Sequence, residues 1–154
     1  MPSILGQWSV PEGDVHRALV RLLSQRIAGD KPLGWASFID GACFDERAGI
    51  PPQLGDFRPD VYAVERVSRR IVIGEAKTVD DIDNDHTRSQ LASYFRHLAS
   101  GPAGEIWMAV PMLSGGAAHR LCRAARASAD AGQIGFVITG WLFGPKPVVE
   151  TWRG

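Results

Sequence analysis

Residues 58–77 read RPDVYAVERVSRRIVIGEAK, and this stretch decides the fold predicted for the chain. Two apolar runs are separated by a charged segment too polar to be buried, which is the pattern of two strands joined as a hairpin. Three charged residues occupy positions where buried strands should be apolar: Asp60, Glu75 and Lys77. Burying a charge costs free energy unless the charge is paired or bound to a metal. These three residues therefore mark a candidate site.

The geometry of a hairpin brings the three side chains together. Alternation along a strand places Glu75 and Lys77 on one face. If the hairpin is centred on Val67-Ser68, Asp60 lies opposite Glu75 on that face, with Cβ atoms about 5 Å apart. Two carboxylates at that separation repel each other unless a cation lies between them, and carboxylate oxygens suit Mg²⁺ or Mn²⁺. Lys77 would then orient the attacking water or stabilise negative charge on a phosphate.

Pro59-Asp60, fourteen intervening residues and then Glu75-Ala76-Lys77 resemble the signature of the PD-(D/E)xK nucleases. This superfamily includes restriction endonucleases, Holliday-junction resolvases and RecB-like nuclease domains, of which the last two are nearest in texture. The resemblance implies that Asp60 and Glu75 bind Mg²⁺, or Mn²⁺ as a substitute, with the carbonyl of Ala76, and that Lys77 assists the water. The alternative is a surface hairpin with an incidental Asp-Glu-Lys cluster.

A helix is predicted over residues 10–28, where apolar residues recur at helical spacing. The resemblance implies an acidic residue on this helix aimed at the metal site. Glu12 would fill that role, since it lies on the apolar stripe three residues before Val15 and four before His16. Ser9 and Glu12 also match a capping box, in which Glu12 only closes the helix start, and both interpretations stay open. We expect His16 to be a partly buried packing residue rather than a ligand.

A second helix is predicted over residues 87–100. In RecB-like and related branches of the superfamily, a Gln on the helix that follows the E-x-K strand sits beside the active site. The resemblance therefore implies that Gln90 completes the site, and that Tyr94, one turn further along, flanks it. The alternative is a solvated Gln90 and a Tyr94 that packs in the core.

The acidic segment before this helix has a weaker likeness to a calcium loop. Asp81, Asp83 and Asp85 have the spacing that opens an EF-hand loop, but His86 stands at the glycine position and Ala92 at the twelfth. We therefore favour a polar loop whose last Asp caps the next helix.

The predicted elements follow the order α-β-β-β-α-β-α-β in one α/β domain, 1–154, with a core over about 8–139 and a C-terminal hairpin over 140–154. The order matches the restriction-endonuclease-like three-layer core, a mixed central sheet flanked by helices. Besides the hairpin and the helices above, the predicted elements are a strand at 33–40, a loop at 41–57, a strand at 105–111, a helix at 114–131 and a strand at 134–139.

Composition limits the possible partners. Lys+Arg and Asp+Glu both number 17, so the formal charge is zero, whereas a protein that coats DNA is usually basic. Contacts to DNA must therefore come from local patches. Cys43 and Cys122 form no motif, which favours free thiols in a cytoplasmic protein, and no apolar run is long enough for a membrane span. Trp141 or Trp152, if exposed, would stack on a base or join a homodimer interface, with core packing as the alternative.

Arg120, Arg123 and Arg126 recur at three-residue spacing on the helix predicted at 114–131. Such a stripe either contacts phosphates or is a solvated helix face, and we favour the solvated face.

These patterns predict a divalent-metal-dependent deoxyribonuclease that hydrolyses phosphodiester bonds in DNA. The second hypothesis is a non-catalytic nucleic-acid-binding or assembly subunit that retains the nuclease fold. Loss of Asp60, Glu75 or Lys77 would favour that second hypothesis, and all three are present. A nucleotide-cofactor enzyme would need a Gly-rich phosphate loop after a strand, which the sequence lacks.

Overall fold

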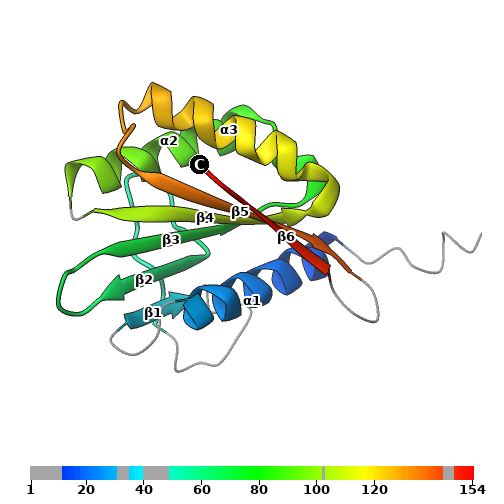
Figure 1. Cartoon of the computed structure of the whole chain (residues 1–154), viewed down its shortest axis with the longest axis horizontal. Coiled ribbons are helices and arrows are strands. Elements are labelled where there is room, and N and C mark those ends of the chain that lie inside the picture. The colour runs from blue at the N-terminus through cyan, green and yellow to red at the C-terminus, as the bar shows by residue number, and fades with distance from the viewer. Residues whose placement is uncertain (1–11, 31–34, 40–48, 102, 144–147) are drawn as a thin grey trace, which may run out of the picture.

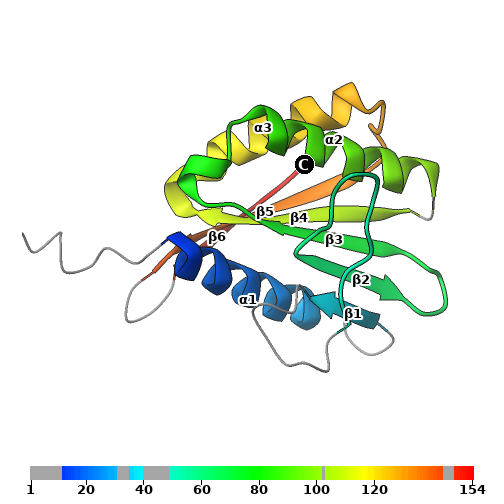
Figure 2. The ribbon, with the colours of Figure 1, turned by 180° about the vertical axis from the view of Figure 1, so that it is seen from behind.

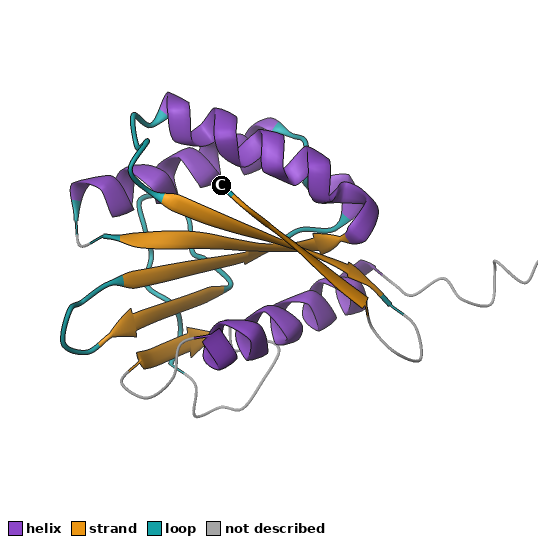
Figure 3. Cartoon of the chain, viewed as in Figure 1, coloured by secondary structure: helices purple, strands orange, loops and turns teal. Residues whose placement is uncertain are grey.

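The computed structural model describes residues 12–30, 35–39, 49–101, 103–143 and 148–154. They form an α/β fold with one mixed six-stranded sheet of order β1-β2-β3-β4-β5-β6. Helix α1 covers one face of the sheet, and α2 and α3 cover the other, which gives three layers (Figure 1, Figure 3). The elements are α1 Glu12–Asp30, β1 Trp35–Ile39, β2 Val61–Glu65, β3 Ile71–Ala76, a 3₁₀ turn η2 Val79–Asp81, α2 Asp85–Ser100, β4 Gly104–Pro111, a 3₁₀ turn η3 Met112–Ser114, α3 Gly115–Ser128, β5 Gly135–Leu142 and β6 Val148–Arg153.

The β2–β3 hairpin has the predicted register. Val61 pairs with Gly74 and Tyr62 with Ile73, which centres the turn on Val67-Ser68. The carboxylate of Glu65 accepts hydrogen bonds from the backbone N–H groups of both turn residues. One step beyond the last ladder pair, the same register sets Asp60 opposite Glu75.

The strands that follow are joined through helices. β3 pairs in parallel with β4, and β4 in parallel with β5, so α2 and α3 serve as the crossover connections. The carboxyl ends of parallel strands lie at one edge of a sheet, where ligand sites of open α/β sheets form. Because β2 is antiparallel to β3, residue 60 lies at this same edge, close to the end of β3.

Two apolar clusters hold the layers together. On the α1 face, the largest contributions come from Leu19, Leu23, Ile27, Val72 and Trp107. On the other face, α2 and α3 pack on the sheet through residues that include Tyr94, Phe95, Leu98, Met108 and Phe136.

Gly74 permits the close approach of α1 to β3. A Cβ atom placed there would lie 2.9 Å from the Cβ of Val61 and 3.2 Å from both Ile27 and Leu23. Separations this short require neighbouring groups to move. A side chain at position 74 would therefore displace α1 from the strand that carries Glu75.

The segment before β2 packs against the α2 face of the sheet. Leu54 belongs to the core there, and the Ser93 hydroxyl of α2 donates to the Leu54 carbonyl at 3.5 Å. Gly55, at φ 64°, allows the tight turn between Leu54 and Phe57. Figure 2 shows this segment crossing the sheet toward α2 before the chain enters β2.

Two details differ from the sequence predictions. The cap of α2 is Asn84, whose side chain accepts from the Thr87 N–H at 2.8 Å, while Asp85 is the first helical residue. The C-terminal hairpin has no separate first strand, because β5 runs on to Leu142 and pairs directly with β6.

Tryptophan burial favours the core-packing interpretation. Trp141 is 8% exposed and belongs to the α1-face cluster, and half-buried Trp152 packs on the opposite cluster. Of the two cysteines, Cys122 is a buried free thiol, and Cys43 lies outside the described residues. None of the described helices has the length and apolar character to cross a membrane.

Candidate active site

Asp60 is fixed at the entry to β2 by two contacts. Its Oδ2 accepts the backbone N–H of Ala76 at 2.9 Å, and the Nε2 of His16 in α1 lies 3.4 Å from the same oxygen. Asp60 is only 7% exposed. The side chain therefore links the end of β3 to α1.

Glu75, at the end of β3, is held by Lys77, just after the strand, and by two side chains of α2. Its Oε1 accepts from the Gln90 Nε2 at 3.0 Å and lies 3.3 Å from the Lys77 Nζ. Its Oε2 accepts from the Tyr94 hydroxyl at 3.2 Å. Because α2 repeats every 3.6 residues, Gln90 and Tyr94 stand one turn apart on the face that meets β3.

The Gln90 amide group leaves one buried atom without a partner. Its Nε2 donates to Glu75 and also to the Tyr94 hydroxyl oxygen, at 3.1 Å. Its Oε1 is buried and has no hydrogen-bond partner. Since buried polar atoms are nearly always paired, this oxygen marks a place where a water or a ligand belongs.

Burial sets the ionisation of the site. Desolvation and then the negative charge of Asp60 raise the pKa of Glu75, Lys77 lowers it, and the net result is a pKa of about 8. Burial and then the Glu75 charge raise the pKa of the Tyr94 phenol. The hydrogen bond to Asp60 raises the pKa of His16. Extra positive charge near Glu75 would therefore be favourable.

The backbone carbonyl of Ala76 faces β2, the side of the strand on which Asp60 lies. The Lys77 N–H donates to the Ala109 carbonyl of β4 at 3.0 Å. Backbone groups of successive strand residues point to alternate sides, so the N–H and C=O of Ala76 face the β2 side. The hydrogen bond from the Ala76 N–H to Asp60 agrees with this direction.

A hard divalent cation fits this donor set. Asp60 and Glu75 supply carboxylates and Ala76 a carbonyl, all oxygen ligands that Mg²⁺ and Mn²⁺ prefer, and the raised pKa of Glu75 indicates a carboxylate short of positive charge. Nowhere in the described residues do three or more His, Cys, Asp or Glu side chains group as a metal site. The protein would thus supply two carboxylates and a carbonyl, with water completing the shell.

The structure brings together most of the residues singled out in the sequence. Glu75, Lys77 and Gln90 lie in one connected network, which Tyr94 joins as a hydrogen-bonding residue rather than as core alone. Asp60 is bonded to the backbone of Ala76, the residue between Glu75 and Lys77. Helix α1 begins at Glu12, but the Glu12 side chain and Ser9 lie outside the described residues, so its two interpretations stay open.

His16 is half-buried, as expected, but its ring also lies against Asp60, a polar contact that was not predicted. The contacts of Glu75 with Lys77, Gln90 and Tyr94 pair both of its carboxylate oxygens. The signal for His16 was its place on the apolar stripe of α1, four residues before the fully buried Val20.

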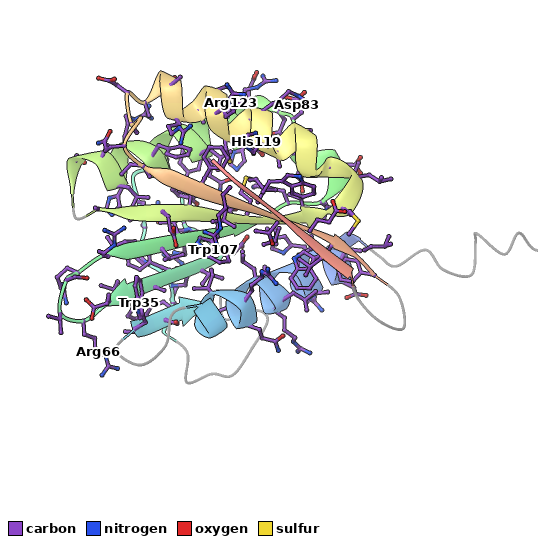
Figure 4. All side chains as sticks on the ribbon, viewed as in Figure 1. Trp35, Arg66, Asp83, Trp107, His119 and Arg123 are labelled. Carbon is purple, nitrogen blue, oxygen red and sulfur yellow. The ribbon has the colours of Figure 1, made fainter. Side chains whose placement is uncertain are left out.

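Other charged groups prove to be structural. Arg126 lies over the Phe136 ring, 4.9 Å from its centroid, and donates to the Ile134 carbonyl. Asp83 and Asp85 both pair with Arg88, so one arginine offsets part of the negative charge of the acidic segment. Arg123 is exposed on the outer side of α3 (Figure 4).

Comparison with models of known protein families, with curated proteins and with solved structures finds no match to this chain.

Proposed function

We propose that the protein is a divalent-metal-dependent nuclease of the PD-(D/E)xK type, with a restriction-endonuclease-like fold, that hydrolyses phosphodiester bonds in DNA. The observation that carries this proposal is the pair of hydrogen bonds from Gln90 and Tyr94 to Glu75. Helix α2 is separate in sequence from the Asp60 and Glu75-Ala76-Lys77 motif. Its polar residues nevertheless converge on the carboxylate that the motif assigns to the metal.

The roles of the residues follow from their contacts. Asp60, Glu75 and the carbonyl of Ala76 would hold Mg²⁺ or Mn²⁺. When bound, such a cation supplies a Lewis acid for phosphoryl oxygens and lowers the pKa of a coordinated water. Gln90 and Tyr94 fix the orientation of the Glu75 carboxylate, and His16 and the Ala76 N–H fix that of Asp60.

Lys77 has a separate part in this scheme. Its ammonium group lies 3.3 Å from the Glu75 Oε1, so it partly neutralises that carboxylate. If Glu75 were instead neutralised by a bound cation, the Lys77 ammonium would be able to face the phosphate. Negative charge develops on that phosphate as water attacks. Water adds to phosphorus and gives up one proton as the P–O bond to one nucleotide breaks, and the leaving oxygen takes up one proton, so that the products are a phosphate end and a hydroxyl end.

A non-catalytic DNA-binding or assembly subunit is the second candidate. The observation in its favour is that both oxygens of Glu75 already have protein partners. A polar network with only a structural role would also have a protein partner for each carboxylate oxygen. The two candidates differ in whether DNA is cut.

The test is incubation of pure protein with labelled single-stranded, duplex and branched DNA in Mg²⁺, Mn²⁺ or EDTA. Cleavage should require the metal and disappear in Glu75→Gln. Arg66→Ala, at the exposed tip of the same hairpin (Figure 4), should cut at the parent rate. DNA binding without cleavage in any condition would replace the nuclease by the non-catalytic subunit.

A further inference from the structure

A second polar pocket lies on the α1 face of the sheet, away from Glu75 and α2. It has a volume of about 380 Å³ and is lined by Arg26 and Gly29 of α1, Trp107 of β4, and Thr151 and Arg153 of β6. Its volume falls within the usual range for small-molecule sites, about 300–1,000 Å³. Trp107 belongs to the core cluster on the α1 side, and Figure 4 shows it at the centre of the sheet.

The strand register relates this pocket to the candidate active site. Thr151 pairs with Thr139, which pairs with Ala109, which pairs with Ala76. Three strand spacings separate Thr151 from Ala76, or about 14 Å along the sheet. The pocket therefore lies on the opposite face of the sheet from Glu75 and is centred on strands further along the sheet.

The polar side-chain groups that the pocket offers to a ligand are donors. The Arg26 Nη2 donates to the Thr151 Oγ1 at 2.9 Å, which leaves the hydroxyl hydrogen of Thr151 able to donate elsewhere. The Arg153 guanidinium lies over the Trp107 ring, 5.9 Å from its centroid. The indole N–H is already used, because it donates to the Glu105 carboxylate at 2.9 Å. A ligand matched to this lining must be rich in acceptors.

The positive charge of the pocket also favours a ligand rich in acceptors. Arg26 and Arg153 line one pocket, and within the described part of the chain neither forms an ion pair. Two like charges in one pocket repel each other unless an anion lies between them. Among the acidic residues, Glu105 is connected to this lining through its carboxylate, which accepts the N–H of Trp107.

Guanidinium groups favour one class of anion in particular. Their planar fork of N–H donors matches the oxygens of phosphate in a bidentate arrangement. Because the Arg153 guanidinium lies over the Trp107 ring, the N–H groups along its edge can still bind an anion. Thr151 adds a hydroxyl donor from the same strand, two residues away.

We propose that this pocket binds a phosphate group, carried either by a DNA strand or by a free phosphate or nucleotide. The DNA source rests on the proposed function, because a nuclease would use such a pocket to bind a phosphate of its substrate strand at some distance from the scissile bond. The free-phosphate source does not depend on that function.

The test is titration calorimetry of the full chain in EDTA with three probes: inorganic phosphate, a 5′-mononucleotide and a short single-stranded oligodeoxynucleotide. The parent should bind at least one probe, and the Arg26→Gln/Arg153→Gln double variant should bind it at least about tenfold more weakly. Arg120→Gln/Arg123→Gln removes the same charge from α3 and should match the parent. Binding of the oligonucleotide alone identifies the strand as the source, and binding of phosphate or mononucleotide identifies the free ligand.

Two further variants keep the outcome decisive. Thr151→Val retains both arginines and should weaken the same probe, which guards against misfolding of the double variant. Glu75→Gln should bind as the parent does, so a failure of the nuclease proposal leaves this result intact. Equal affinity of the parent and the Arg26→Gln/Arg153→Gln variant, or no binding of any probe by the parent, would overturn the phosphate site.

Discussion

Gln90 reaches across the α2–β3 interface and donates from its Nε2 to the Glu75 Oε1 at 3.0 Å. The same nitrogen donates to the Tyr94 hydroxyl, which in turn donates to the other oxygen of Glu75. The three side chains therefore form a closed ring of hydrogen bonds. A closed ring fixes the carboxylate in one orientation, since rotation of any member breaks two bonds.

Gln90→Ala should lower cleavage more than it lowers stability. Losing hydrogen bonds to a buried charged group costs about 1–3 kcal/mol of stability. Without Gln90 the Glu75 carboxylate would no longer be held in one orientation, and cleavage should slow by about ten- to a hundredfold, as loss of groups that orient metal ligands does. Denaturant unfolding and cleavage rates in Mg²⁺ measure the two effects. Ser89→Ala, one residue earlier on the exposed side of α2, is the matched control. An unchanged cleavage rate in Gln90→Ala would remove Gln90 from the site.

The metal-free protein should lose stability as pH rises. The folded-state pKa of Glu75 is raised to about 8, against about 4.3 in an unfolded chain. Between these values the folded state holds the extra proton, so the stability from this group is fully present below pH 4 and disappears as pH rises through 8. The pKa of His16 is also raised, so the stability that this residue contributes is likewise lost as pH rises above the pKa of histidine in the unfolded chain.

Urea unfolding in EDTA between pH 5 and pH 9 should show this loss, on the order of a few kcal/mol. Glu75→Gln cannot ionise and should flatten most of the dependence. A parent profile that rises with pH over this interval would contradict the assigned burial of Glu75.

His16→Ala should weaken the site through Asp60. The imidazole lies 3.4 Å from the Asp60 Oδ2, and groups that orient a ligating carboxylate typically contribute about ten- to a hundredfold in metal affinity or activity. Manganese titration and cleavage assays measure this loss. Arg17→Ala, the next residue on the exposed side of α1, should behave as the parent. If His16 were only a packing residue, stability would fall while manganese affinity stayed the same.

Mn²⁺ should stabilise the protein, and more strongly at high pH. Binding to the folded state alone adds about 2.7 kcal/mol at a hundredfold excess over Kd. Because ligand carboxylates must be deprotonated, the gain should be larger at pH 8.5 than at pH 6.5, where Glu75 carries its proton. Melting curves with and without millimolar Mn²⁺ measure it, and Asp60→Asn should show little gain. An unchanged melting temperature and no calorimetric signal for the parent would exclude the metal site.

The sequence predicted what depends on strand alternation and helical period. The register of the β2–β3 hairpin followed from the turn at Val67-Ser68, and the place of Gln90 followed from the resemblance and the helix after β3. The contact of His16 with Asp60 could not be predicted in the same way. It depends on how closely α1 packs on β3, which Gly74 decides through contacts distant in sequence.

The ion pair between Lys77 and Glu75 was missed for a related reason. Alternation shows that Glu75 and Lys77 share a face, but not that the Nζ folds back to 3.3 Å from the Oε1. That conformation is favoured because both side chains are buried and an unpaired buried charge is costly. The polar lining contributed by β6 was also unpredicted, since it depends on β5 running on to Leu142 and on the pairing of β6 with it.

Lys77 gives the sharpest separation of enzyme from binding subunit. In the metal-free protein its ammonium group pairs with Glu75 and opposes the rise of the Glu75 pKa. Lys77→Ala should therefore raise that pKa further and destabilise the metal-free protein at pH 8–9, and saturating Mg²⁺ should restore most of the loss. Cleavage should not be restored, because removal of a group that stabilises transition-state charge typically slows the chemical step by about a hundredfold or more.

Asp60→Asn provides the contrast, since it should lose metal binding and cleavage together. Melting curves, manganese titration and single-turnover cleavage of a labelled oligonucleotide, run on the parent and both variants, separate the two patterns. A structural ion pair predicts that Lys77→Ala, once stabilised by Mg²⁺, cuts as fast as the parent. A catalytic lysine predicts a stable, metal-loaded and DNA-binding variant that cleaves at most about one-hundredth as fast.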